Sequence, residues 1–235
     1  RSSRSGEARY RKALAEMRLQ RSAEALNSFQ ALLERTPGTT FAADAWFWQG
    51  TLLREAGKLH DAEAALRRAL DAKPRPELER ETKLQLAVGL HTQGKHEEAA
   101  ALLGDLLEGP IRSRMTPSLL QWLAEYEATR NRYARSGAAA SALIESGTDD
   151  TARQAGWVLA GRAAAAQGRD QEASAAFTRA LAMPPRTAYA AEAALQLGSL
   201  ELKSGDAKAA ATHFELAATL SGSDSLTGIR ARAYA

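Results

Sequence analysis

The chain has 235 residues, of which 45% are hydrophobic and 25% charged, with 31 basic residues, 28 acidic residues and no cysteine. This composition can form a buried core, excludes disulfides and cysteine chemistry, and gives a net charge of +3 that is too small to indicate nucleic-acid binding. Because no run of about 18 or more apolar residues occurs, the sequence predicts no membrane-spanning segment.

Small residues recur every 37 residues from one end of the chain to the other, as the differences 50 − 13 and 62 − 25 show. One column consists of Ala13, Gly50, Ala87, Ala124, Gly161, Gly198 and Ala235. A second column consists of Ala25, Ala62, Ala99, Ser136, Ala173 and Ala210. A fixed period of this length predicts stacked repeats with an extended surface for a partner.

The period divides the chain into repeats at 6–42, 43–79, 80–116, 117–153, 154–190 and 191–227, with a partial seventh helix at 228–235. We expect one continuous solenoid domain over 1–235. Because the chain lacks a starting Met, we interpret it as a fragment or mature region of a longer polypeptide.

Each repeat is predicted to contain two helices. In the second repeat, apolar spacing predicts helices over 43–56 and 59–72, with Gly57 between them and Pro74 after the second. The turn position of the other repeats holds Gly94, Gly168 and Gly205. Asn131 holds it in the fourth repeat, where asparagine is the next-best residue for left-handed backbone.

The fourth repeat departs most from the pattern in its second helix. Ser136 replaces alanine, and Ala140 stands where the other repeats have phenylalanine or leucine. Thr116 and Pro117 still predict a capped helix start. We expect a local irregularity in the stack at this repeat.

No group of residues predicts catalysis or a cofactor. The four histidines lack metal-ligand spacing, and Ala100 stands where a zinc-protease helix beginning at His96 needs its second histidine. Phosphate-binding glycine loops and the nucleophile elbow are also absent from the sequence. We therefore expect no enzyme activity, no catalytic or metal residues, no cofactor and no small-molecule substrate.

The strongest basic patch is Arg130–Arg135, which contains Arg130, Arg132 and Arg135. Phosphate or nucleic-acid binding is one interpretation of it. A solvated helix face paired with Glu125 and Glu127 is the interpretation we prefer.

Paired helices with these columns resemble the tetratricopeptide repeat (TPR) family. The resemblance is carried in the second repeat by Trp46, Gln49, Gly50, Leu53, Gly57, Ala62, Leu66, Ala69 and Pro74. In the fifth repeat it is carried by Trp157, Gly161, Gly168, Ala173, Phe177, Ala180 and Pro185. It implies an all-α, right-handed α-solenoid of about six repeats, a TPR-like superhelix whose first helices line a concave groove for a partner protein or peptide.

Helical spacing indicates which first-helix side chains face that groove, because they do not point toward the small columns. They are Tyr10, Phe47, Trp48, Gln85, His91, Gln121, Trp122, Glu125, Arg162 and Ser199. Trp48 and Trp122 are the candidate anchors, because aromatic side chains dominate interfaces. The columns that grip a carboxylate in chaperone-binding relatives contain Phe47, Leu84 and Gln121 here, which argues against that mode.

The sequence thus predicts a non-catalytic scaffold that binds a protein or peptide. A regulatory repeat segment of a larger enzyme or transcription regulator is one alternative, and nucleic-acid binding through Arg130–Arg135 is another. The stretch 41–50 also resembles repeat proteins of the bacterial envelope, including Tol–Pal-associated and outer-membrane assembly proteins, and polysaccharide-export scaffolds share the architecture. We therefore expect the periplasm or cell envelope, with the cytoplasm and self-association left open.

Overall fold

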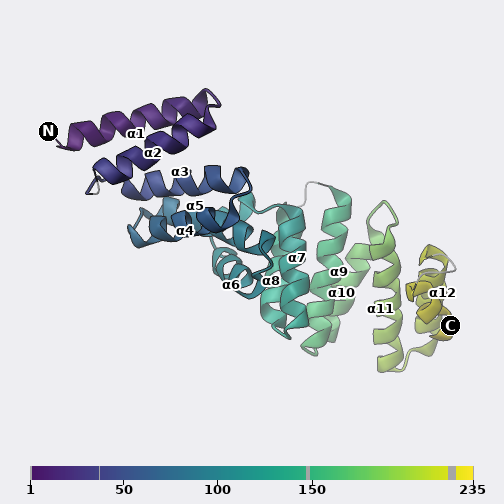
Figure 1. The fold of residues 1–235 in the computed structure, drawn as a ribbon. Coiled ribbons are helices and arrows are strands. Elements are labelled where there is room, and N and C mark those ends of the chain that lie inside the picture. The colour runs from purple at the N-terminus through teal and green to yellow at the C-terminus, as the bar shows by residue number, and fades with distance from the viewer. Residues whose placement is uncertain (1, 37, 147–148, 222–225, 235) are drawn as a thin grey trace. The chain divides into compact units, whose positions relative to one another are not determined.

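A computed structural model describes residues 2–36, 38–146, 149–221 and 226–234 of the chain (Figure 1). Over these residues the protein is all-α, with thirteen α-helices and one 3-10 helix and no strand. The helices form successive antiparallel hairpins, as the repeat pattern predicts, and among the described residues none is long and apolar enough to cross a membrane. Ala235, the last member of the first small column, and Pro37, which occupies the repeat position of Pro74 in the first repeat, lie outside the described part.

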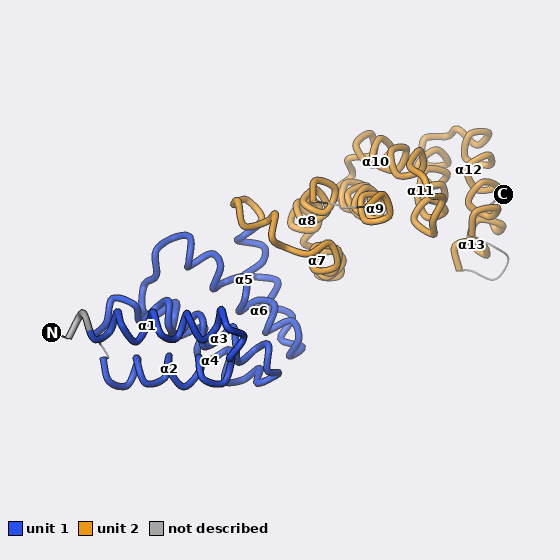
Figure 2. The backbone as a smooth tube through the Cα atoms, turned by 90° about the horizontal axis from the view of Figure 1, so that it is seen from above, with its two compact units in different colours: residues 1–106 blue, residues 107–235 orange. Residues whose placement is uncertain are grey.

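The chain divides into two compact units, residues 1–106 and 107–235 (Figure 2). Unit 1 contains α1 (Ser2–Arg18), α2 (Ser22–Arg35), α3 (Ala42–Glu55), α4 (Leu59–Asp71), α5 (Pro76–Thr92) and α6 (His96–Leu106). Unit 2 contains η1 (Pro110–Arg114), α7 (Pro117–Thr129), α8 (Tyr133–Ser146), α9 (Asp150–Ala166), α10 (Asp170–Ala182), α11 (Ala188–Ser204), α12 (Ala207–Ser221) and α13 (Leu226–Tyr234).

The two helices of a hairpin cross where the small residues lie. A Cβ added at Gly50 would be 2.6 Å from Cγ of Leu66, and one added at Gly198 would be 2.7 Å from Cε1 of Phe214. Ala25, Ala173 and the other described members of the second small column are buried as well. Close helix crossings need small residues at the contact and larger ones beside it, so the predicted packing is confirmed.

The turn within each hairpin uses the left-handed backbone expected from its sequence. Asn131 has φ 58°, in the same region as Gly57 at 74°. Gln20 takes φ 59° at the corresponding position of the first repeat, although glutamine does not favour this conformation. A glutamine in this conformation is strained by its Cβ, whereas asparagine is more tolerant.

The fourth repeat begins as predicted and then differs from the others. The Thr116 side chain accepts a hydrogen bond from the backbone N–H of Leu119, which caps α7. The preceding connection is the 3-10 helix η1, and the boundary between the two units, at residues 106 and 107, falls just before it. Ser136 and Ala140 are both buried, so α8 packs through small side chains.

Candidate partner-binding site

Two of the sequence-predicted groove residues, Tyr10 and Trp48, line one pocket of about 290 Å³ in unit 1. Its walls come from the first helices of three successive hairpins. They are formed by Tyr10, Leu14, Met17 and Arg18 of α1, Asp44 and Trp48 of α3, Arg75, and Leu78 of α5. The Tyr10 ring is fixed by stacking on Phe41, with ring centroids 4.8 Å apart and an interplanar angle of 15°. The first helices therefore present an aromatic pocket that is partly open to solvent.

An ion pair lies at this pocket. Nη1 of Arg75 is 3.3 Å from Oδ1 of Asp44, which joins the start of α5 to α3. Burial raises the pKa of Tyr10 above its ordinary value, and the Asp44 carboxylate raises it further, against smaller lowering by a hydrogen bond with Trp48 and by the Arg75 charge. Tyr10 is therefore a neutral phenol at physiological pH, so it offers a partner an aromatic face and a hydroxyl.

Phe47 does not belong to this pocket, which corrects its assignment as a groove residue. Its side chain is only 4% exposed, because helical spacing places it on the packed side of α3 with Ala43 and Gly50. It contacts Trp48 edge-on, with ring centroids 4.9 Å apart. Phe47 therefore packs against Trp48 on the buried side of the pocket wall.

The other predicted groove residues of unit 1 lie away from the pocket. Gln85 is half-buried on α5, where its Nε2 donates to Oε1 of Glu81 at 3.1 Å. His91, near the end of α5, lies beside His96 at the start of α6, with ring centroids 5.4 Å apart. Burial lowers the pKa of His91, and the neighbouring His96 lowers it further.

In unit 2, the predicted residues of α7 interact with one another and with a distant first helix. Nε2 of Gln121 donates to Oε1 of Glu125 at 3.0 Å and to the hydroxyl of Tyr189 on α11 at 2.9 Å. Trp122 stacks on Tyr126, with ring centroids 5.3 Å apart. Gln121 and Tyr189 are 68 residues apart, so this contact links the first helices of the fourth and sixth repeats.

The remaining two predicted residues of unit 2 lie on α9 and α11. Nη1 of Arg162 is 3.6 Å from Oε1 of Glu192, an ion pair between successive first helices. The exposed hydroxyl of Ser199 donates to the carbonyl of Leu195 within its own helix. The structure thus brings Gln121 and Glu125 together.

Three residues at these surfaces, Asp44, Arg75 and Tyr189, were not predicted as site residues from the sequence. A signal for Tyr189 exists, because one repeat position near the start of each first helix holds Phe41, Leu78, Met115, Tyr189 and Leu226. Arg4 and Ala152 are the exceptions. Asp44 shares a repeat position with Glu7, Glu81 and Glu192, and Arg75 shares one with Arg112 and Arg186, but neither position is charged in every repeat.

The basic patch Arg130–Arg135 is engaged with its own unit. Nε of Arg132 lies 2.5 Å from the fully buried Glu127 carboxylate, and Nη1 of Arg135 lies 4.0 Å from it. Arg130 lies over the Tyr126 ring, 5.4 Å from its centroid. Pairing of the patch with Glu127 agrees with the preferred interpretation, while Glu125 is bound by Gln121.

Antiparallel helix pairs that cross at glycine or alanine and repeat every 37 residues define a helical-repeat protein. Within the described residues, no three histidines or carboxylates are placed to hold a metal ion. A family model described as "Tetratricopeptide repeat" matches residues 10–75 and 158–225, which is more than half of the chain. The chain belongs to the tetratricopeptide repeat family, whose members are typically non-catalytic scaffolds for protein–protein interaction.

Solved structures of the same fold are similar over most of the chain. A tetratricopeptide repeat protein from Parabacteroides merdae is 15% identical, with TM-score 0.52 and 99% of both chains covered. The C-terminal part of a TPR repeat-containing protein from Cytophaga hutchinsonii is 13% identical, with TM-score 0.51, covering 90% of this chain and 78% of that one.

The Naa15/Naa10 complex bound to HypK-THB is 17% identical, with TM-score 0.60, and the match covers 98% of this chain but 34% of that one. At these identities the likeness concerns the fold alone. The comparison with curated proteins gives no match.

Proposed function

We propose that this protein is a non-catalytic scaffold that holds a segment of a partner protein against the first helices of unit 1. The observation that carries the proposal is the convergence of Tyr10 and Trp48, from two different hairpins, in one pocket with an ion pair beside it. Half-buried aromatic side chains in a concave site are the usual energetic centres of protein interfaces.

The chemistry of the pocket indicates the kind of segment that fits. Leu14, Met17 and Leu78 give it an apolar lining, and its volume of about 290 Å³ suits one or two apolar side chains. Asp44 and Arg75 offer a hydrogen-bond acceptor and a donor for the partner's backbone or polar side chains. A terminal-carboxylate clamp is not supported, because Phe47 and Leu84 are buried at the positions where that mode requires polar groups.

Peptides selected from a display library of random 12-residue sequences against the full chain test this assignment. Trp48→Ala is expected to weaken the peptides that bind here by roughly thirtyfold, equivalent to about 2 kcal/mol. Trp48→Phe, which keeps an aromatic ring, is expected to weaken them less. Isothermal titration calorimetry measures each affinity.

Trp46→Ala is the matched control, since it removes the same side chain from the same helix but from another pocket. Far-UV circular dichroism establishes that each variant remains helical. If every selected peptide binds Trp48→Ala as tightly as the unmodified chain, the first helices of unit 1 are not the binding surface. Localisation in the bacterial envelope stays a prediction from the stretch 41–50.

A further inference from the structure

A second surface is marked by a tryptophan–arginine pair that occurs twice. The guanidinium of Arg68 lies 4.8 Å from the Trp46 ring centroid, and that of Arg179 lies 4.6 Å from the Trp157 ring centroid. Both members are displaced by 111 residues, or three repeats of 37 (157 − 46 and 179 − 68). In each case the tryptophan comes from a first helix and the arginine from the second helix of the same hairpin.

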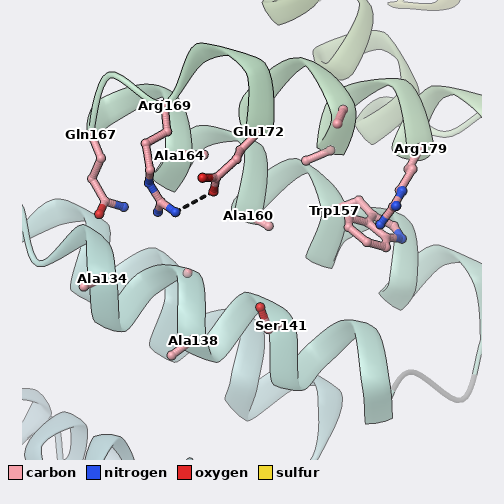
Figure 3. A pocket seen from close by; sticks show the side chains of 13 residues that line it. Ala134, Ala138, Ser141, Trp157, Ala160, Ala164, Gln167, Arg169, Glu172 and Arg179 are labelled. Atoms are coloured by element: carbon pink, nitrogen blue, oxygen red, sulfur yellow. Dashed lines mark hydrogen bonds and ion pairs between the residues drawn. The ribbon is translucent and has the colours of Figure 1, made fainter.

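Both pairs line a groove whose other wall is the second helix of the preceding hairpin, and the two grooves differ in size. In unit 1 the groove is formed by α2, α3 and α4 and encloses about 390 Å³. In unit 2 it is formed by α8, α9 and α10 and encloses about 800 Å³. Figure 3 shows the unit 2 groove, with Ala134, Ala138 and Ser141 along one wall and the Trp157–Arg179 pair at one end.

The larger groove results from smaller side chains at corresponding positions, 111 residues apart. In three such pairs the unit 1 residue is the larger one. Leu26 corresponds to Gly137, Gln30 to Ser141, and Gln49 to Ala160. Since the tryptophan and the arginine are kept while the bulk beside them is lost, the unit 2 groove leaves the Trp157 side open to an incoming group. Side chains within the unit are close-packed and do not fill the groove of about 800 Å³, so it has room for side chains of a binding partner.

The charges along the unit 2 groove favour a partner segment that carries an acidic side chain. At one end, Nη1 of Arg169 is paired with Oε2 of Glu172 at 2.5 Å, so these two charges compensate each other (Figure 3). At the other end, Arg179 is exposed and lies over the Trp157 ring, and over the described ranges no carboxylate forms an ion pair with it. A guanidinium that lies over an aromatic ring can still form a bidentate contact with a carboxylate through its N–H groups.

We infer that the α8–α10 groove is a docking site for a segment of a partner protein that carries leucine-sized apolar side chains and a carboxylate. The apolar side chains pack on Gly137 and Ala160, whose counterparts in unit 1, Leu26 and Gln49, are bulkier. The carboxylate pairs with Arg179 beside the Trp157 ring. This surface lies on the second-helix side of unit 2 and is separate from the Tyr10–Trp48 pocket, so a scaffold of this design holds two segments at once.

Peptides from the same library provide the test. The inference expects a class of selected peptides that contain an aspartate or glutamate beside aliphatic residues. Arg179→Gln should weaken this class by about tenfold, because a charge-assisted pair is lost. Ser141→Gln combined with Ala160→Gln introduces the residues of the unit 1 groove, Gln30 and Gln49, and should abolish binding of the class, with the helical circular dichroism spectrum unchanged.

Arg68→Gln is the matched control, because it breaks the corresponding pair in the narrower groove, and it should leave the affinity of this class unchanged. Trp48→Ala should also leave it unchanged, which separates this surface from the pocket on the first helices of unit 1. The inference is overturned if every selected peptide still binds the variant that combines Ser141→Gln with Ala160→Gln. It is also overturned if the peptides that no longer bind this variant bind Arg179→Gln with unchanged affinity. A dimer in sedimentation equilibrium that dissociates in Arg179→Gln would assign the groove to a second copy of the chain and overturn it too.

Discussion

Gly161 on α9 lies directly against the ring of Phe177 on α10, so that an added Cβ would be 2.6 Å from Cε1 of that ring. The ring is fully buried and cannot move aside without disturbing its neighbours. Gly161→Ala is therefore expected to lower the free energy of unfolding by about 1–3 kcal/mol through overpacking. Guanidinium denaturation followed by circular dichroism measures the change.

Gly89→Ala is the matched control, since Gly89 also lies within a first helix. A Cβ there would meet only Cδ of Arg54, at 3.9 Å, which is an ordinary contact. Because alanine favours helix over glycine, this variant should gain up to about 1 kcal/mol. Equal losses in the two variants would show that the helix crossing, and hence the role assigned to the small column, is misplaced.

Gln20→Gly is expected to stabilise the first hairpin. Gln20 has φ 59°, where a side chain costs roughly 1–2 kcal/mol. The added flexibility of glycine in the unfolded chain offsets about 0.4–1 kcal/mol of that gain. We therefore expect a net gain of about 0.5–1 kcal/mol, measured as a higher denaturation midpoint, and Gln20→Ala should show no such gain.

The repeat fold could be predicted from the sequence because it depends on contacts within each hairpin. Gly50 against Leu66 and Gly198 against Phe214 are separated by the same 16 residues (66 − 50 and 214 − 198), so one column of small residues and one of large residues reveal each crossing. The same reasoning identified Asn131 as a turn residue. Only its repeat position marks Gln20, since glutamine does not favour left-handed backbone.

The candidate site was only partly predictable, because it depends on how successive hairpins meet. Helical spacing placed Tyr10 and Trp48 on the exposed side of their helices, yet it also placed Phe47 there, which is one position before Trp48 and packs inward. The contact of Asp44 with Arg75 crosses from one hairpin to the next, and the charged repeat positions that contain them do not by themselves show that the two side chains meet. An open groove such as that of α8–α10 arises where small side chains replace larger ones, and no sequence motif marks such a replacement.

Glu63 on α4 joins the second hairpin to the third. Its carboxylate accepts hydrogen bonds from Nζ of Lys95 at 2.8 Å and from Nε2 of Gln93 at 3.1 Å, and it is paired with Arg67 in its own helix. Burial alone would raise the pKa of Glu63, but the hydrogen bonds from Lys95, Arg67 and Gln93 outweigh it and lower the pKa.

Because the pKa of Glu63 is lower in the folded state, the stability it contributes is present above the unfolded value of about 4.5 and is lost as the pH falls through the folded value. Glu63→Gln should therefore destabilise the protein at neutral pH, and the difference from the unmodified chain should shrink as the pH is lowered below about 4.5. Denaturation midpoints across pH measure it. Glu215→Gln, at an exposed position of α12, is the matched control. A pH-independent loss in Glu63→Gln would contradict the assignment.

Gln154 on α9 is a fully buried amide that fixes the connection between α10 and α11. Its Nε2 donates to the carbonyls of Ala180 at 2.9 Å and Met183 at 3.0 Å, and its Oε1 accepts from the hydroxyl of Thr187. Gln154→Leu keeps the size of the side chain but leaves these groups without their partner, so we expect a loss of about 2 kcal/mol in unfolding free energy. Gln167→Leu, which removes an exposed amide from the end of the same helix, should cost far less. Faster amide exchange at residues 183–190 in Gln154→Leu, with α7 and α8 unchanged, would show that this one side chain orders the connection, and uniform exchange throughout unit 2 would argue that it does not.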